Sequence, residues 1–199
     1  MPDYTFDPET GQYRDAGGQP LSRKELIALS ETQIGDTDAE IAAATEVYLA
    51  GEISQDEWQA KLRDAILAGF VLQFMLGRGG AAQMTDADWE ALGVAVQAQY
   101  DYLDGFAGDL EMLSAAETSA RAGLYGQAQY KALWLGLGAL MTAAGMTEER
   151  RRLGRAEHCD DCVALAALGW QPLGSLPEPG DASQCRANCR CTKEYRIAE

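Results

Sequence analysis

The chain has 199 residues, of which 47% are hydrophobic and 24% charged, as in an ordinary folded protein. Its net charge of −15 is unevenly placed. Residues 1–149 carry 8 basic and 24 acidic side chains, whereas residues 150–199 carry 8 basic and 7 acidic ones. Because phosphate binding relies on Lys and Arg, the acidic first part is a poor match for nucleic acid. Such a surface is usually solvated, or it faces a basic protein partner.

The opening residues, 1–20, are rich in Gly, Pro, Asp and Thr and show no hydrophobic periodicity, so we expect an extended arm. They lack the basic lead and apolar run of a secretory signal, which favours folding in a cytoplasm. The longest apolar stretch, Ala65 to Leu76, has 12 residues, whereas a bilayer crossing needs roughly 20. We therefore expect no membrane partner.

A repeated pattern predicts helix starts after this arm. A Ser or Thr that can cap a helix N-terminus is followed three residues later by an acidic residue. The instances are Ser22 with Glu25, Thr37 with Glu40, Ser54 with Glu57, Thr85 with Asp88, and Ser114 with Glu117. Apolar residues at helical spacing follow, as in Trp58, Leu62, Ile66, Phe70 and Phe74. Helix ends are expected at Gly35, Gly51, Gly77 to Gly80, Gly105 with Gly108, and Gly145.

The stretch from Ser114 to Gly145 is rich in Gly and Ala, which predicts a long helix that is tightly packed or kinked. A phosphate-binding loop is the other interpretation, but no strand precedes it and no Lys-Ser or Lys-Thr follows. Nothing before Arg150 alternates like a strand. The predicted fold is mainly α, with an acidic all-α body over residues 21–149 and a small cysteine-rich, zinc-binding subdomain over residues 150–199.

A short basic patch opens this subdomain, formed by Arg150, Arg151, Arg152 and Arg155. Such a patch is typical of a helix C-terminus or of a solvated surface. It is also a candidate binding surface for acidic groups on a partner protein or for DNA. Both interpretations remain open from the sequence.

All five cysteines lie in the last 41 residues, at Cys159, Cys162, Cys185, Cys189 and Cys191. A Cys-x-x-Cys pair offers two thiolates from one turn, and a second pair brought back by a hairpin completes the tetrahedron that zinc accepts. Residues 169–180 are rich in Gly and Pro and suit such a reversal. We expect four of the five cysteines to hold a structural zinc ion, with His158 as a second-choice ligand. Iron would fit four thiolates equally well.

Disulfide bonds are the alternative use of these cysteines. A cytoplasmic origin and an odd cysteine count argue against a full set, although one or two bridges could form in oxidising surroundings. Catalysis is not expected. Four cysteine ligands leave zinc no open position, His158 is the chain's single histidine, and the zinc deaminase pattern is missing.

Several motifs of the last 50 residues resemble motifs of a known protein family. They are Leu153-Gly154, Ala156-Glu157-His158-Cys159, Asp161-Cys162, Gly169-Trp170, Leu176-Pro177, Pro179-Gly180, Cys185, and Asn188-Cys189-Arg190-Cys191. Together they resemble the end of phage head-morphogenesis proteins, the minor head proteins similar to protein F of phage Mu. The Asn-Cys-Arg-Cys motif is the most specific, and a looser likeness extends to residues 13–23 and 48–58.

The resemblance implies a low-copy virion protein that acts in head assembly near the portal or the inner procapsid face. Its partners would be portal or capsid proteins of the same phage, and its locations the host cytoplasm during assembly and then the virion. Many members have a His shortly before Asn-Cys-Arg-Cys, where this chain has Cys185, so the fourth ligand is left open. The second hypothesis is an adaptor whose zinc site recognises another protein or nucleic acid.

Overall fold

The computed structural model describes residues 4–7, 10, 12–154, 156–181 and 183–198. Most of them lie in helices, which confirms the predicted mainly α fold. The elements are β1 (Thr5–Asp7), β2 (Gln12–Arg14), β3 (Pro20–Leu21), α1 (Arg23–Leu49), α2 (Gln55–Arg78), η1 (Ala81–Gln83), α3 (Asp86–Asp109), η2 (Leu110–Met112), α4 (Ala115–Ala128), α5 (Tyr130–Ala143), β4 (Glu148–Arg152), α6 (Asp160–Ala167), β5 (Gln171–Pro172), η3 (Arg186–Asn188) and β6 (Thr192–Arg196).

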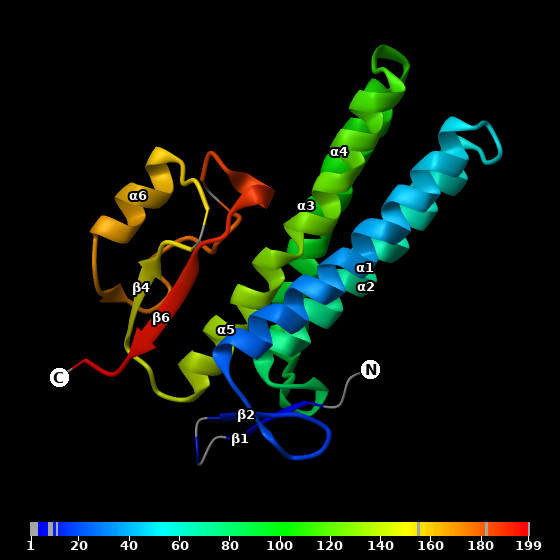
Figure 1. Ribbon diagram of the computed structural model, residues 1–199. Coiled ribbons are helices and arrows are strands. Elements are labelled where there is room, and N and C mark those ends of the chain that lie inside the picture. Colours follow the sequence, from blue (N-terminus) through cyan, green and yellow to red (C-terminus); the bar gives the residue numbers. More distant parts are fainter. Residues whose placement is uncertain (1–3, 8–9, 11, 155, 182, 199) are drawn as a thin grey trace.

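Helices α1 to α5 form an elongated bundle, the helical body, in which the α1–α2 turn and the α3–α4 turn lie at the same end (Figure 1). Helix α2 packs against both α1 and α5, and α1 packs against α4. The apolar face predicted on α2 is buried in the main core; its members are Trp58, Leu62, Ile66, Phe70 and Phe74. Among the described residues, none of the helices combines the length and the hydropathy needed to cross a membrane.

Four of the five predicted helix starts are confirmed. In each, the Ser or Thr side chain accepts from the backbone three residues on, and the acidic side chain accepts from the capping residue. These capping boxes are Ser22 with Glu25, Ser54 with Glu57, Thr85 with Asp88, and Ser114 with Glu117.

The fifth start, at Thr37, and the helix end at Gly35 are wrong. Helix α1 runs through both positions, and the Thr37 hydroxyl donates instead to the Gln33 carbonyl oxygen. Ile34 and Ile41 are both buried and lie two turns apart on one face, so the apolar face continues past the glycine. A single Gly costs a helix only about 1 kcal/mol, which this burial offsets.

The extended arm expected over residues 1–20 is also wrong where that segment is described. Strands β1, β2 and β3 form an antiparallel sheet at the end of the helical body opposite the hairpin turns (Figure 1). Tyr4, Phe6 and Tyr13 are buried against helices α1, α2 and α5. The backbone N–H of Phe6 also donates to the Gly79 carbonyl oxygen over 3.0 Å. The segment is therefore part of the core.

The glycine-rich stretch, expected as one long helix that is tightly packed or kinked, forms two helices, α4 and α5, that meet at Gln129. Helices α2 and α5 are in backbone contact. A Cβ on Gly136 would overlap the Phe74 carbonyl oxygen, and one on Gly77 would overlap that of Leu133. The glycines at these two positions therefore permit the close approach of the helices.

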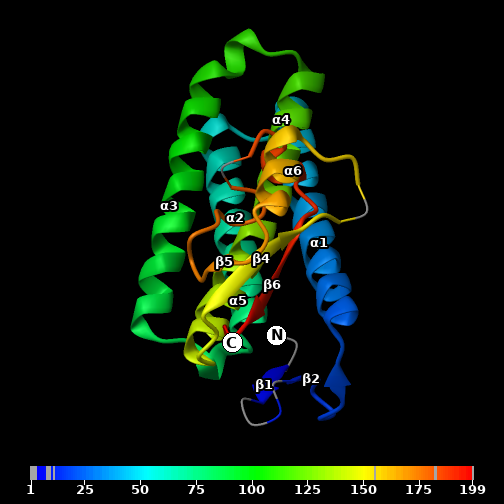
Figure 2. The same cartoon turned by 90° about the vertical axis from the view of Figure 1, so that its left-hand side faces the viewer.

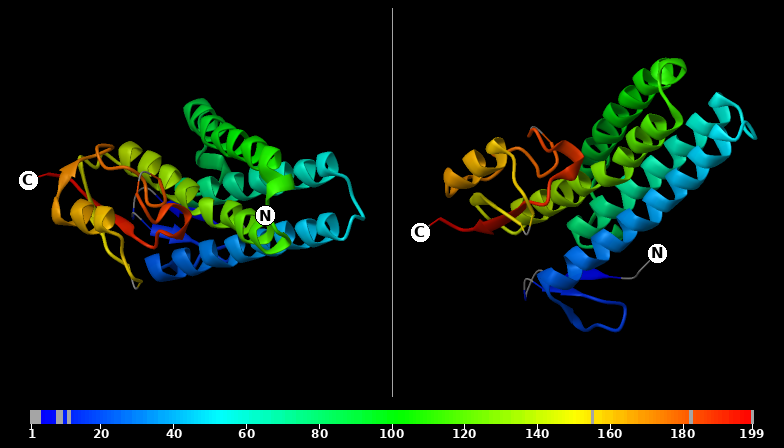
Figure 3. Two further views of the ribbon diagram at one scale, coloured as in Figure 1. Left: turned by 90° about the horizontal axis from the view of Figure 1, so that it is seen from above. Right: turned by 45° about the horizontal axis from the view of Figure 1, so that its top comes forward.

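The C-terminal segment, from Glu148 onward, lies over one side of the helical body beside α5 (Figures 2 and 3). It contains a sheet of order β5-β4-β6, in which both neighbours pair with β4 in antiparallel fashion. Strand β4 begins before Arg150, so the expectation of no strand in that region was wrong. Its pattern was hidden because Glu149 and Arg151 are the buried residues of the strand.

A buried ion pair connects α2 to the start of α3. Arg78 and Asp88 are only 9% and 7% exposed, and their side chains lie 2.9 Å apart. Burial opposes ionisation of the carboxyl, but hydrogen bonds from Arg78 and Thr85 lower the pKa of Asp88 below its usual value. The carboxylate therefore stabilises the folded state at neutral pH.

We predict that Gly136→Ala destabilises the fold by about 1 to 3 kcal/mol, because the added methyl group meets the α2 backbone. Gly138→Ala is the matched control in the same helix, since its nearest neighbour would be Glu178 at 3.9 Å. This control should stabilise the chain by up to about 1 kcal/mol through helix propensity. Urea unfolding of both variants provides the measurement, and equal effects would refute the close packing.

We predict that Asp88→Asn lowers the free energy of unfolding by about 3 kcal/mol, because it leaves Arg78 buried without a counter-charge. The matched control is Asp104→Asn, also on α3, whose pair with Arg63 is 56% and 34% exposed. This exposed pair is worth less than about 1 kcal/mol. The Asp88 contribution is present above the pKa of an unfolded aspartate, about 4, and is lost as the pH falls through the lower folded value. Urea unfolding between pH 3 and 7 should therefore show the free energies of unfolding of the wild type and of Asp88→Asn converging as the pH falls. A difference between them that does not change with pH would contradict the prediction.

Candidate metal centre

The five cysteines reach one place from two short structures. Cys159 is the N-cap of α6, and Cys162 lies in the first turn of that helix. Cys185 precedes the 3-10 turn η3, and Cys189 follows it. Cys191 lies directly before β6. We call these five residues the cysteine cluster.

The sulfur atoms of the cysteine cluster lie at distances suited to a shared ion. Cys162 Sγ is 3.4 Å from Cys185 Sγ and 3.8 Å from Cys189 Sγ. Four sulfurs bound tetrahedrally at the usual zinc–sulfur distance would be about 3.8 Å apart. The five thiols are free rather than joined in disulfides. The cluster is therefore positioned to bind a metal ion.

Backbone hydrogen bonds favour ionisation at two of these thiols. Burial raises the pKa of Cys159, but N–H groups of Cys162 and Cys185 outweigh it and lower the value to about 7. Burial likewise opposes ionisation of Cys189, yet N–H groups of Cys191 and Gly180 lower its pKa. Such donors stabilise a thiolate, which is the form that binds metal.

The other three thiols hold their protons more strongly in the absence of an ion. Burial raises the pKa of Cys191 to about 11, and the adjacent Cys189 adds to this shift. Burial also raises the pKa of Cys162 and of Cys185. A metal ion would have to displace these protons, so its affinity should fall as the pH falls.

His158 lies at the edge of the cysteine cluster. Its Nδ1 is 3.7 Å from Cys191 Sγ, and its Nε2 is 2.9 Å from the Gly154 carbonyl oxygen. A histidine that binds metal through one ring nitrogen usually donates its other ring N–H to a backbone carbonyl, a carboxylate or water. The second-choice ligand is therefore within reach of the cluster.

The basic patch is placed on a strand, so its interpretation as a helix C-terminus was wrong. Arg150 and Arg152 pair with Glu194 of β6 at 2.6 and 3.4 Å. Arg151 is buried and donates to the Pro177 carbonyl oxygen, which removes it from the surface. Arg155 lies outside the described residues. Each of the three arginines of the patch that the structure describes therefore has a partner within the chain.

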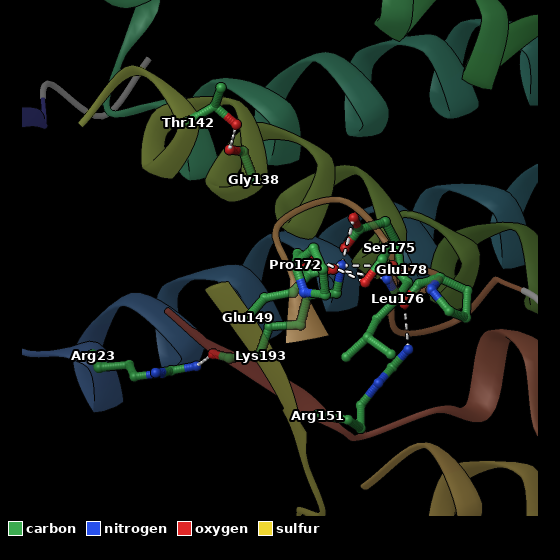
Figure 4. Close-up of polar contacts among 11 residues, drawn as sticks. Arg23, Gly138, Thr142, Glu149, Arg151, Pro172, Ser175, Leu176, Glu178 and Lys193 are labelled. Atoms are coloured by element: carbon green, nitrogen blue, oxygen red, sulfur yellow. Dashed lines mark hydrogen bonds and ion pairs between the residues drawn. The ribbon is translucent and has the colours of Figure 1, made fainter. Parts of the chain in front are cut away.

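Sequence reasoning missed a buried ionic group in the C-terminal segment. Lys193 is fully buried, with its Nζ 2.9 Å from Glu149 and 2.8 Å from Glu178 (Figure 4). It also donates to the Leu176 carbonyl oxygen. Burial raises the pKa of Glu178, and the charge of Lys193 opposes this shift. The one signal in the sequence for this buried ionic group was that Glu149 and Arg151 are two residues apart, so that both charged side chains point to the same side of the strand.

Side chains of the helical body hold the chain around the cysteine cluster. Arg190 donates to Gln127 of α4, and Tyr130 of α5 donates to the Cys191 carbonyl oxygen over 3.3 Å. Lys131 pairs with Asp181 at 2.8 Å. These three body residues flank Gln129, where α4 meets α5. The cluster is therefore attached at the kink of the helical body.

The five cysteines selected from the sequence thus meet in one cluster, while the basic patch is spread over a strand. Comparison of the chain with protein-family models, with curated proteins and with solved structures found no match. The likeness of its C-terminal motifs to phage minor head proteins is therefore a hypothesis about function.

We predict that a strong chelator makes residues 159–191 of the reduced, full-length chain sensitive to protease, because the segment there has few apolar residues to hold it. The far-UV circular dichroism of the helical body should change little. Cys162→Ser should have the same effect, whereas Val163→Ser, at an exposed position of the same helix, should not. Unchanged protease resistance after chelation and in Cys162→Ser would contradict a bound ion.

Proposed function

We propose that the chain is a structural protein of a phage virion, a minor head protein that acts in head assembly near the portal. One observation carries the proposal: the residues with the family likeness are those that build the C-terminal segment. All five cysteines converge in the cluster. A Cβ on Gly154 would overlap the Arg190 carbonyl oxygen, so only glycine fits there. The motif therefore corresponds to a three-dimensional unit.

Further motif residues have comparable structural roles. The guanidinium groups of Arg150 and Arg196 both lie over the Trp170 ring, at 4.5 and 4.4 Å from its centroid. The backbone N–H of Leu176 donates to Glu149 over 2.8 Å. Such roles support a shared fold with the family, because a chance match of short motifs would not select the residues on which one substructure depends.

The ion in the cysteine cluster is zinc in this proposal, and its role is structural. Thiolate sulfur suits both zinc and iron, and zinc in sulfur-rich sites normally stabilises a small fold without catalysing a reaction. The carboxylates that favour helices, such as Glu25, Glu57 and Glu117, serve as caps. Helix capping accounts for these three carboxylates, and in this proposal the helical body acts in assembly and catalyses no reaction.

The partner in this proposal is a portal or capsid protein of the same phage, with a basic surface. Residues 1–149 have a charge balance of −16, and helix α3 contains neither Lys nor Arg. Opposite charge on a partner would speed and orient docking. Nucleic acid would be repelled by this surface. The protein would be in the host cytoplasm during assembly and later in the virion.

We predict that the chain is present at low copy number in heads purified from the phage that encodes it, and that it cross-links to the portal or capsid protein. Mass spectrometry of purified particles provides the measurement. Phage lacking the gene should be rescued by the wild type and by Val163→Ser, but poorly by Cys162→Ser. Absence from particles, with co-purification of a host protein, would contradict the proposal and favour the adaptor hypothesis.

A further inference from the structure

The sulfur atoms of the cysteine cluster form two groups that share one member. Cys159, Cys162 and Cys185 make one group, and Cys162, Cys189 and Cys191 make the other. Within each group the sulfurs all lie within 4.8 Å of one another. A single tetrahedral ion needs one group of four at about 3.8 Å. The cysteines, all of them in the described part of the chain, form two groups of three instead.

His158 lies beside the second group, next to Cys191. Its Nε2–H donates to the Gly154 carbonyl oxygen over 2.9 Å, which leaves the lone pair on Nδ1. That Nδ1 is 3.7 Å from Cys191 Sγ, a distance close to the edge of a metal tetrahedron. A nitrogen donor therefore lies beside Cys191, one of the three sulfurs of the second group.

We propose that the cysteine cluster holds two zinc ions bridged by the thiolate of Cys162. The first ion binds Cys159, Cys162 and Cys185, with solvent in its fourth position. The second ion binds Cys162, Cys189, Cys191 and His158. The inference rests on the metal centre of the proposed function and adds its nuclearity, its bridging ligand and the role of the histidine.

The charges of the cluster favour two ions over one. Two zinc ions displace five thiol protons and leave the site with one net negative charge. One ion with four thiolates would leave two negative charges and an unused fifth thiol. Cys162 and Cys191 are both fully buried, and a buried thiolate gains from a second adjacent cation. The central position of Cys162 in both groups makes it the natural bridge.

The test is the zinc content of the full-length chain, purified reduced and measured by native mass spectrometry and elemental analysis. Two ions per wild-type chain are expected, and two in the Val163→Ser control. His158→Ala removes a ligand of the second ion alone and should retain one ion under mild chelation. Two ions in His158→Ala under the same conditions would overturn the assignment of that ligand.

A second measurement does not depend on the folding of a variant. In the wild-type chain loaded with cobalt, a shared thiolate should couple the two metal spins, so the low-temperature magnetic moment falls below that of two independent ions. Uncoupled ions would overturn the bridge. One zinc ion per chain would overturn the pair but leave the head-protein proposal intact, and no zinc would overturn both metal proposals.

Discussion

The buried sulfur of Cys162 is the point at which two distant parts of the C-terminal segment meet. One part is the start of α6, and the other begins with Cys185, which is separated from Cys162 by 22 residues. The interior beside this contact is ionic, with Lys193 between two carboxylates. Ionic groups of this kind contribute little net stability. The attraction of thiolates to a metal therefore has to supply what an apolar core supplies in the helical body.

The cysteine cluster is attached to helices α4 and α5, so the meeting of the two parts at Cys162 also affects the helical body. Gln127, Tyr130 and Lys131 contact Arg190, Cys191 and Asp181 at the cysteine cluster, and they lie on both sides of Gln129. The Gln129 side chain is itself fully buried, against Gly69 of α2. The position of the cysteine cluster and the angle between α4 and α5 are therefore linked. In a head protein, this link would fix the orientation of the acidic helices relative to the C-terminal segment.

The helices could be predicted because interactions between residues close in the sequence determine them. The strands could not be predicted, because contacts between distant residues determine them. Capping boxes and the apolar face from Trp58 to Phe74 follow from interactions within a few residues. The β1–β3 sheet has strands of at most three residues, too short for a periodic signal. Strand β4 was missed because charged residues occupy its inward positions. The spacing of the cysteines predicted a metal centre, but their division into two groups depends on the relative placement of α6 and η3.

The proposed metal centre requires that sulfur atoms from both parts of the C-terminal segment surround the bound metal. X-ray absorption at the metal edge, on the reduced chain as purified, measures the nearest ligand atoms directly. The predicted result is a first shell dominated by sulfur at about 2.3 Å, with a minor nitrogen contribution from His158. A first shell of oxygen and nitrogen alone, or a chain that carries no metal, would contradict the account.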